Sequence, residues 1–194
     1  MRELAILSFV TLDGVMQSPT SADEDASGGF AGGGWGAPYW AEVMPQVYAE
    51  AMSAPYDLLF GRKTYDIFAS HWPHVDADAD PVAARLNGAH KYVVTRSDET
   101  PVPWGPATRT TGDIVREIER LKRSDGPLLQ VHGSAELIQT LLRHELIDEF
   151  RLWTFPVVVG GGKLLFGEGA APANLTMVRS EETGNGVVMS VYRR

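Results

Sequence analysis

The chain has 194 residues, contains no cysteine and carries a formal net charge of −8 at pH 7. Without cysteine it forms no disulfide bonds, thiolate metal sites or cysteine nucleophiles, and its acidic balance argues against nucleic acid or an anionic membrane as the main partner. The hydrophobic content of 44% suits one domain over residues 1–194. The lack of thiols, and of a signal-peptide pattern in residues 1–15, predicts a cytoplasmic protein.

The first predicted element is a buried strand over residues 4–10, because nearly all of its side chains are apolar. The strand runs into the turn residues Asp13 and Gly14, so Asp13 is placed where the strand opens toward a site. Two roles are open to Asp13. It is either a catalytic or substrate-orienting carboxylate, or a carboxylate that hydrogen-bonds its own turn.

Residues 17–38 are rich in glycine, serine and aspartate and show no periodicity. A loop of this length inside a compact domain is often a functional lid. Near its end, Trp35 and Tyr39 either stack on a flat heterocyclic substrate or fill the edge of the core. Residues 41–52 then predict a helix with Pro45 in its second turn, where proline kinks or delays the helix.

The second predicted strand, residues 57–60, leads directly into a glycine and the start of a helix. Cations at a helix start oppose the helix dipole, and they are understandable if an anion binds there. The four residues of this junction therefore form a candidate phosphate site: Gly61, Arg62, Lys63 and Thr64.

The polar loop over residues 70–80 contains histidines and aspartates, but their spacing matches no defined metal site, so we predict no metal. A short helix follows over 81–87, and then a third strand over 91–95. This strand ends in a cation flanked by hydroxyls, which again suits a phosphate. The residues concerned are Thr95, Arg96 and Ser97.

After a predicted loop over residues 98–110 and an amphipathic helix over 113–123, an apolar strand over 128–131 turns sharply at His132 and Gly133. A second helix begins there, with Ser134 as its N-cap. Free N–H groups at a helix start attract phosphate, and a glycine lets the ligand approach the backbone. This third anion junction consists of Gly133, Ser134, Ala135 and Glu136.

Toward its end the chain no longer alternates between predicted strands and helices. A strand over residues 150–155 leads into a glycine loop at 160–162, and an Asn-Gly turn within 183–186 lies between alternating segments at 174–179 and 187–192. Such a turn is a strong hairpin signal. We therefore predict an α/β fold with three α/β/α layers, whose mixed, mostly parallel sheet ends in an antiparallel C-terminal hairpin.

Taken together, these segments resemble the dihydrofolate reductase-like superfamily. They are most similar to the reductase domain of bacterial riboflavin biosynthesis and its stand-alone relatives. The likeness covers nearly the whole chain, in order. The matching segments are VTLDGVM at 10–16, LLFGRKTYD at 58–66, KYVVTRS at 91–97, VHGSAELIQTLL at 131–142, DEFRL at 148–152 and PVVVGGGKLLF at 156–166.

The resemblance implies an NADPH-binding protein. The Gly61–Thr64 junction would contact the cofactor phosphates, residues 95–97 would hold the adenosine 2′-phosphate, and residues 133–136 would cradle the pyrophosphate. These are the three junctions that the residues themselves indicate as anion sites.

Two departures from the riboflavin reductases argue against a ribityl-phosphate pyrimidine as substrate. Their usual glutamate is replaced by His132, and their usual lysine after Asp-Gly by Val15. Our leading hypothesis is an NADPH-dependent reductase of a small pterin, pyrimidine or flavin-like compound, with His132, Trp35 and Tyr39 near the substrate. The alternative is a non-catalytic NADP(H)-binding sensor or regulator. We expect a homodimer, because the apolar run 150–159 would otherwise leave an exposed sheet edge.

Overall fold

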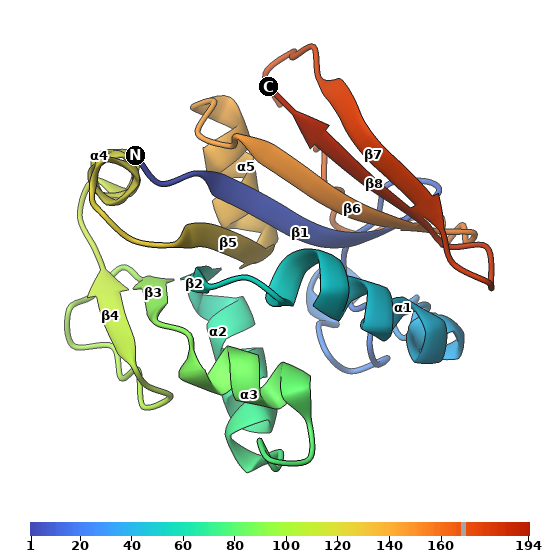
Figure 1. The fold of residues 1–194 in the computed structure, drawn as a ribbon, viewed down its shortest axis with the longest axis horizontal. Helices are drawn as coiled ribbons and strands as arrows, with labels where there is room; N and C mark the ends of the chain where they lie inside the picture. Colours follow the sequence, from blue (N-terminus) through green and yellow to red (C-terminus); the bar gives the residue numbers. More distant parts are fainter. Residues whose placement is uncertain (168–169) are drawn as a thin grey trace.

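Eight strands form one mixed sheet in the computed structural model, which describes residues 1–167 and 170–194. Their order is β4-β3-β2-β5-β1-β6-β8-β7 (Figure 1). The first six strands of that order are parallel, whereas β8 is antiparallel to both β6 and β7. The strands are β1 (Leu4–Thr11), β2 (Tyr56–Gly61), β3 (Lys91–Val94), β4 (Ala107–Thr110), β5 (Leu128–Gly133), β6 (Glu149–Phe155), β7 (Thr176–Glu182) and β8 (Val188–Arg193). The predicted mixed sheet with a C-terminal antiparallel hairpin is confirmed.

Strand β1 lies between β5 and β6, with Leu4 opposite Leu129 and Ala5 opposite Glu149. Its sequence LAILSFVT explains this central place, because seven of its eight residues are buried. A strand covered on both faces needs apolar side chains at odd and even positions alike.

Helices cover both faces of the sheet, and Figure 1 shows α4 and α5 on the side opposite α1 and α3. The alternation of side chains along β2 explains the two layers, since Leu58 and Phe60 pack in one core and Leu59 in the other. The first core contains side chains of α1, α2 and α3, and the second contains those of α4 and α5. The helices are α1 (Trp40–Val47), α2 (Arg62–His71), α3 (Pro81–Gly88), α4 (Ile114–Arg123) and α5 (Ala135–Arg143).

Two sequence predictions need correction. The segment 98–110 was expected to be loop throughout, yet its last residues form β4 at the edge of the sheet. β4 reads ATRT and only Thr110 is buried, so it lacks the apolar pattern by which a strand is recognised. The helix expected over 41–52 begins at Trp40 and continues through Pro45, and from Tyr48 to Met52 it becomes a π-helical turn.

None of the helices in the described part of the chain combines the length and the apolar character that crossing a membrane requires.

Candidate functional site

A crevice opens at the carboxyl ends of the parallel strands, between the neighbouring strands β1 and β5. From β1 the chain continues through α1 to β2, on the face that carries the first core. From β5 it continues through α5 to β6, on the opposite face. Because the two connections leave in opposite directions, this is the point in an open α/β sheet where ligands bind.

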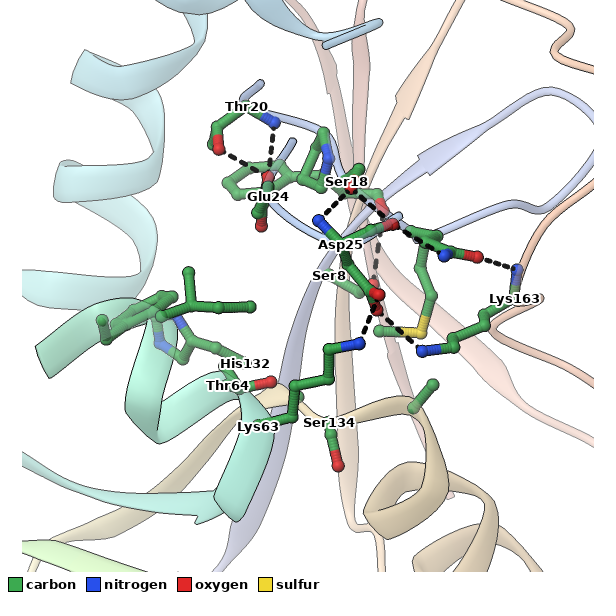
Figure 2. A pocket seen from close by; sticks show the side chains of 18 of the residues that line it. Ser8, Ser18, Thr20, Glu24, Asp25, Lys63, Thr64, His132, Ser134 and Lys163 are labelled. Carbon is green, nitrogen blue, oxygen red and sulfur yellow. Dashed lines mark hydrogen bonds and ion pairs between the residues drawn. The ribbon is translucent and has the colours of Figure 1, made fainter. Parts of the chain in front are cut away.

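A cavity of about 120 Å³ lies at this point (Figure 2). It joins the two strand ends to the first turns of α2 and α5 and to the long loop after β1. Its walls are formed by Leu7, Ser8, Phe9, Met16, Gln17, Ser18, Pro19, Thr20, Glu24, Asp25, Lys63, Thr64, Ile67, Phe68, His132, Gly133, Ser134, Ala135 and Lys163. Six of the residues singled out from the sequence are thus brought together here: Lys63, Thr64, His132, Gly133, Ser134 and Ala135.

The two glycine junctions are packed against each other. Phe60 pairs with Gly133 across β2 and β5, and a Cβ added at Gly133 would lie 2.5 Å from Thr64 Oγ1. A Cβ at Gly61 would clash with the Ser134 side chain. Gly133 also has φ of +153°, which side chains rarely tolerate. Glycine is therefore required at both positions for α2 and α5 to start side by side at the cavity.

The first turns of these helices keep donors for a ligand. Ser134, the N-cap of α5, makes no side-chain capping hydrogen bond within the described residues, and Gly61, the N-cap of α2, has no side chain to make one. The first N–H groups of a helix have no intrahelical acceptor, and the helix dipole makes this end positive. Glu136 lies in the first turn of α5 but is exposed and does not line the cavity.

His132 forms part of the apolar wall of the cavity. Its ring packs edge-on against Phe68 and Phe60, with centroids 5.7 and 6.1 Å apart. Burial lowers the pKa of His132 to about 4, so the imidazole is neutral at pH 7. Its Nε2 lies 2.8 Å from the amide nitrogen of the buried Gln130, which donates to it.

The predicted anion junction at residues 95–97 lies outside the cavity but is linked to the junction at 61–64. Thr95 Oγ1 accepts a hydrogen bond from the N–H of Ser97, which orders the turn, and Arg96 between them is exposed. Arg62 donates from Nη1 to the carbonyl of Pro101 in the loop that follows. The guanidinium of Arg62 and the turn at 95–97 thereby belong to one surface beside α2.

Asp13 is not among the wall residues of the cavity, and its contacts are those of the second role given from the sequence, a carboxylate that hydrogen-bonds near its own turn. Its carboxylate accepts hydrogen bonds from Thr11 Oγ1 (2.5 Å), from the N–H of Gly160 (2.7 Å) and from the N–H of Val159 (3.3 Å). The bond from Thr11 and the backbone bond from Gly160 hold the pKa of Asp13 below its usual value. This geometry assigns Asp13 to holding the glycine loop against the end of β1.

Asp13→Asn therefore separates the two roles. We expect cofactor affinity and kcat/KM to stay near wild type, with a lower melting temperature, because the Asn amide group cannot accept from both N–H groups of the loop. Steady-state kinetics and thermal unfolding are the measurements. A loss of about 10²–10⁴-fold in kcat/KM, typical of removing an acid or base, would restore the catalytic role.

The aromatic residues expected near the substrate lie elsewhere. Trp35 is only 7% exposed, donates from Nε1 to the carbonyl of Gln17 and packs edge-on against Phe155 at 5.1 Å. Tyr39 packs edge-on against the same ring at 5.5 Å. Neither lines the cavity: Trp35 is part of the first core, and the half-buried Tyr39 packs against that core. The apolar wall of the cavity is instead built from Phe9, Ile67 and Phe68.

Two charged residues of the site were not predicted from the sequence, Asp25 in the long loop and Lys163 after the glycine loop. Asp25 Oδ2 accepts a hydrogen bond from Lys163 Nζ (2.7 Å), and its Oδ1 accepts one from Lys63 Nζ. Burial alone would raise the pKa of Asp25, but the bonds from Lys163 and Lys63 outweigh it and hold that pKa well below the usual range. The only signal in the sequence was a lysine directly after three glycines.

Lys163 and Gln17 also border a second, wider cavity of about 600 Å³. It lies between the two glycine-rich segments of the chain, and the residues that these segments contribute to its wall are 27–32 and 159–163. Gln17 and Lys163 line both cavities, so they stand on the boundary between them.

Comparison with known proteins agrees with this architecture. The model of the RibD C-terminal domain family matches residues 2–189. The uncharacterized protein YyaP of Bacillus subtilis (strain 168) is 32% identical over 167 residues, which are 84% of this chain and 88% of YyaP.

Two solved structures share the fold. A putative riboflavin biosynthesis protein from Shewanella sp. PV-4 superposes with a TM-score of 0.65 at 22% identity, covering 100% of this chain and 99% of that one. Dihydrofolate reductase from Enterococcus faecalis, complexed with NADP(H) and RAB-propyl, superposes with a TM-score of 0.62 at 11% identity, covering 99% and 96%. The dihydrofolate reductase-like fold expected from the sequence is confirmed.

Proposed function

Since the chain belongs to the RibD C-terminal domain family, we propose that it is an NADPH-dependent reductase that transfers hydride to a small, flat heterocycle such as a pterin, a pyrimidine or a flavin-like compound. The observation that carries the proposal is the meeting of two glycine junctions at one crevice. Gly61 and Gly133 let α2 and α5 begin side by side there, and a pair of helix starts of this kind suits a pyrophosphate.

The residues present fit the phosphates of such a cofactor. Thr64 and Ser134 offer hydroxyl groups at the cavity wall, and Lys63 offers a cation. In our proposal these residues hold the pyrophosphate, while Arg62 and the turn at 95–97 hold the adenosine 2′-phosphate. Charge-assisted bonds of this kind are about twice as strong as neutral ones.

When bound, NADPH supplies the hydride, so the protein has to provide position, orientation and a dry site. Phe9 and Phe68 are apolar wall residues that exclude water. His132 is neutral at pH 7 and adds no charge to this wall of the cavity. The bonds from Lys163 and Lys63 favour the ionised form of Asp25.

The alternative is a protein that binds NADP(H) as a sensor or regulator and does not turn it over. One observation favours it: His132 and Val15 stand where the riboflavin reductases usually carry a glutamate and a lysine. Loss of NADPH absorbance at 340 nm across a panel of pterins, pyrimidines and flavins separates the two. Turnover of one compound supports the reductase, binding without turnover on the whole panel supports the sensor, and absence of binding contradicts both.

We expect the protein to bind NADPH about 10- to 100-fold more tightly than NADH. Arg62 and Arg96 each offer a charge-assisted contact to the 2′-phosphate, worth about 1.5–3 kcal/mol when desolvated, and partial exposure places both at the low end. The Arg62→Ala/Arg96→Ala variant should lose this preference in a fluorescence titration. Arg116→Ala, an exposed residue of α4, is the matched control. A preference that survives the double substitution would contradict this assignment.

We also propose that the chain forms a homodimer, although not for the reason given from the sequence. Residues 150–155 are not at a sheet edge, because β8 covers β6, and Phe150 and Phe155 are buried. One of the two sheet edges is β7, where all seven side chains are exposed, including Met177 (54%) and Val178 (59%). An edge strand with free backbone groups and apolar side chains readily pairs with a second copy.

Light scattering at micromolar concentration should therefore give twice the chain mass of 21.2 kDa. Met177→Glu should shift the protein to the monomer, because it adds a charge to the exposed apolar part of β7. A wild-type mass of 21.2 kDa would reject the dimer.

A further inference from the structure

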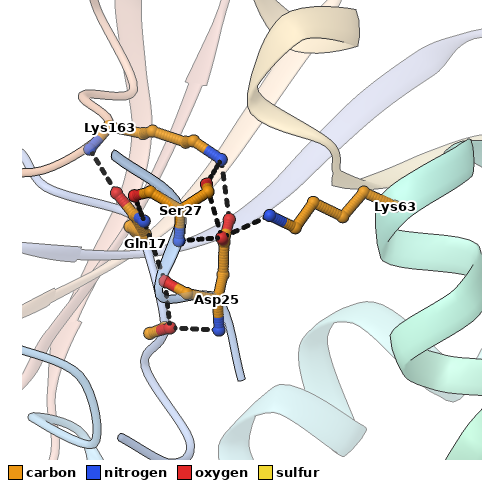
Figure 3. Close-up of polar contacts among 6 residues, drawn as sticks. Gln17, Asp25, Ser27, Lys63 and Lys163 are labelled. Carbon is orange, nitrogen blue, oxygen red and sulfur yellow. Dashed lines mark hydrogen bonds and ion pairs between the residues drawn. The ribbon is translucent and has the colours of Figure 1, made fainter. Parts of the chain in front are cut away.

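The carboxylate of Asp25 is held by two lysines from opposite sides of the cavity mouth (Figure 3). Lys63 comes from the first turn of α2, and Lys163 from the segment that follows β6. Ser27 adds two further bonds to the carboxylate, from its N–H at 3.0 Å and from its hydroxyl at 2.6 Å. The side chain of Asp25 is only 12% exposed, so these four donors replace most of its hydration.

The loop around Asp25 is anchored by its backbone as well. Ser18 Oγ accepts a hydrogen bond from the N–H of Asp25 at 2.6 Å, and Gln17 Nε2 donates to its carbonyl at 2.8 Å. Gln17 Oε1 in turn accepts from the N–H of Lys163 at 3.0 Å. Asp25 thus connects the loop to both walls of the crevice. The cavity that remains beneath the loop has a volume of about 120 Å³.

The groups around Asp25 are those of an anion-binding site, and the Asp25 carboxylate is the anion that they bind. Two ammonium groups face one carboxylate, so one positive charge remains uncompensated by Asp25. The first turns of α2 and α5 add the positive ends of two helix dipoles at the same cavity. An incoming phosphate carries more charge than a carboxylate and presents more acceptor oxygens, so it competes well for the same donors.

We propose that Lys63 and Lys163 form a subsite for an anionic phosphate group of the ligand, and that Asp25 occupies this subsite as an internal competitor until the loop opens. The inference rests on the proposed function only for the source of the phosphate, which is either the cofactor pyrophosphate or a phosphorylated substrate. Lys163 is the new binding residue, and its place between the two cavities lets it serve a ligand that extends from one into the other.

Inorganic pyrophosphate, titrated calorimetrically at low ionic strength, tests the subsite without any turnover. Asp25→Asn removes the competing charge, and we expect it to bind pyrophosphate at least about tenfold more tightly than wild type. Asp23→Asn is the matched control, because Asp23 lies on the same loop and its carboxylate accepts from the hydroxyl of Ser21. It should leave the affinity unchanged. The Asp25→Asn/Lys163→Gln variant should lose the gain.

An affinity that is unchanged or weaker in a folded Asp25→Asn variant would overturn the proposal, as would a gain that persists without Lys163. Asp25→Ser repeats the measurement if the asparagine variant does not fold. Competition between pyrophosphate and NADP⁺ assigns the subsite to the cofactor, and simultaneous binding assigns it to a phosphorylated substrate. If no variant binds NADP⁺ but the pyrophosphate gain is present, the proposed function fails and the subsite stands. If NADPH is turned over without that gain, only the subsite fails.

Discussion

Gly133→Val is expected to abolish measurable NADPH binding, a loss of more than about 100-fold in affinity. The first atom of the new side chain would lie 2.5 Å from Thr64 Oγ1, well inside contact distance. Thr64 belongs to the first turn of α2, and its other side-chain carbons would lie only 3.3 and 3.4 Å from the new atom, so a change of rotamer would leave the contact tight. In addition, φ of +153° at this position is strained for a residue with a branched side chain.

The same clash lowers stability, so binding and folding have to be measured on the same samples, by cofactor titration and by circular dichroism with thermal unfolding. Gly88→Ala is the control. Gly88 is the last residue of α3 and an added Cβ there meets nothing within 4 Å, so the substitution should leave the affinity at wild type. A folded Gly133→Val protein with wild-type affinity would mean that the glycine serves only the packing of β5 on β2.

Glu149→Gln is expected to lower the free energy of unfolding by about 2–3 kcal/mol. Glu149 is 6% exposed, and its two carboxylate oxygens accept from Arg151 Nε at 2.6 Å and from Arg193 Nε at 2.7 Å. Arg193 lies opposite Glu149 on β8, so the carboxylate joins the parallel part of the sheet to the hairpin. Breaking a buried pair typically costs about 3–5 kcal/mol, and we lower that range because the Arg193 side chain is 45% exposed.

Thermal unfolding should show this as a fall of roughly 5–10 °C for a chain of this size. Glu3→Gln provides the comparison, because Glu3 contacts the same arginine but its side chain is 52% exposed. It should change stability by less than about 0.5 kcal/mol. Equal effects of the two substitutions would show that burial of Glu149 does not strengthen its ion pairs.

The effect of Glu149 also depends on pH. Burial works against its ionisation, but the bonds from Arg193 and Arg151 outweigh burial and lower its pKa from the ordinary 4.5. The unfolded chain therefore binds the proton more tightly than the folded one, so the stabilisation is complete above about pH 5. It is lost as the pH falls through the folded-state pKa. The difference between wild type and Glu149→Gln should thus be full at pH 7 and should shrink in acid.

Much of the fold followed from local patterns. The apolar runs at 4–10 and 128–131 indicated strands buried on both faces, and the Asn-Gly turn at 185–186 indicated the terminal hairpin. The weakly patterned β4 was missed, because a short polar edge strand is held by backbone bonds to β3 and not by apolar side chains.

Part of the candidate site was also predictable from local sequence. Each strand–glycine–helix junction is formed by a few consecutive residues. Local sequence therefore indicates the positions of these helix N-termini and of their glycines. Gly61 and Gly133 were recognised in this way, as was the hydroxyl-bearing Thr64. The sequence did not indicate that the two glycine junctions pack against each other across β2 and β5.

The contacts of Asp13, Trp35, Asp25 and Lys163 depend on the tertiary structure and could not be read from the sequence. Asp13 meets Gly160, which is 147 residues away, and Asp25 meets Lys163, which is 138 residues away. Trp35 packs against Phe155 at the end of β6, which is 120 residues further along the chain. Local propensity carries no information about such distances, because they depend on the order of strands in the sheet and on the path of each connection. Local sequence therefore indicates which segments offer donors to an anion, whereas the strand order and the path of the chain bring particular side chains into the crevice with them.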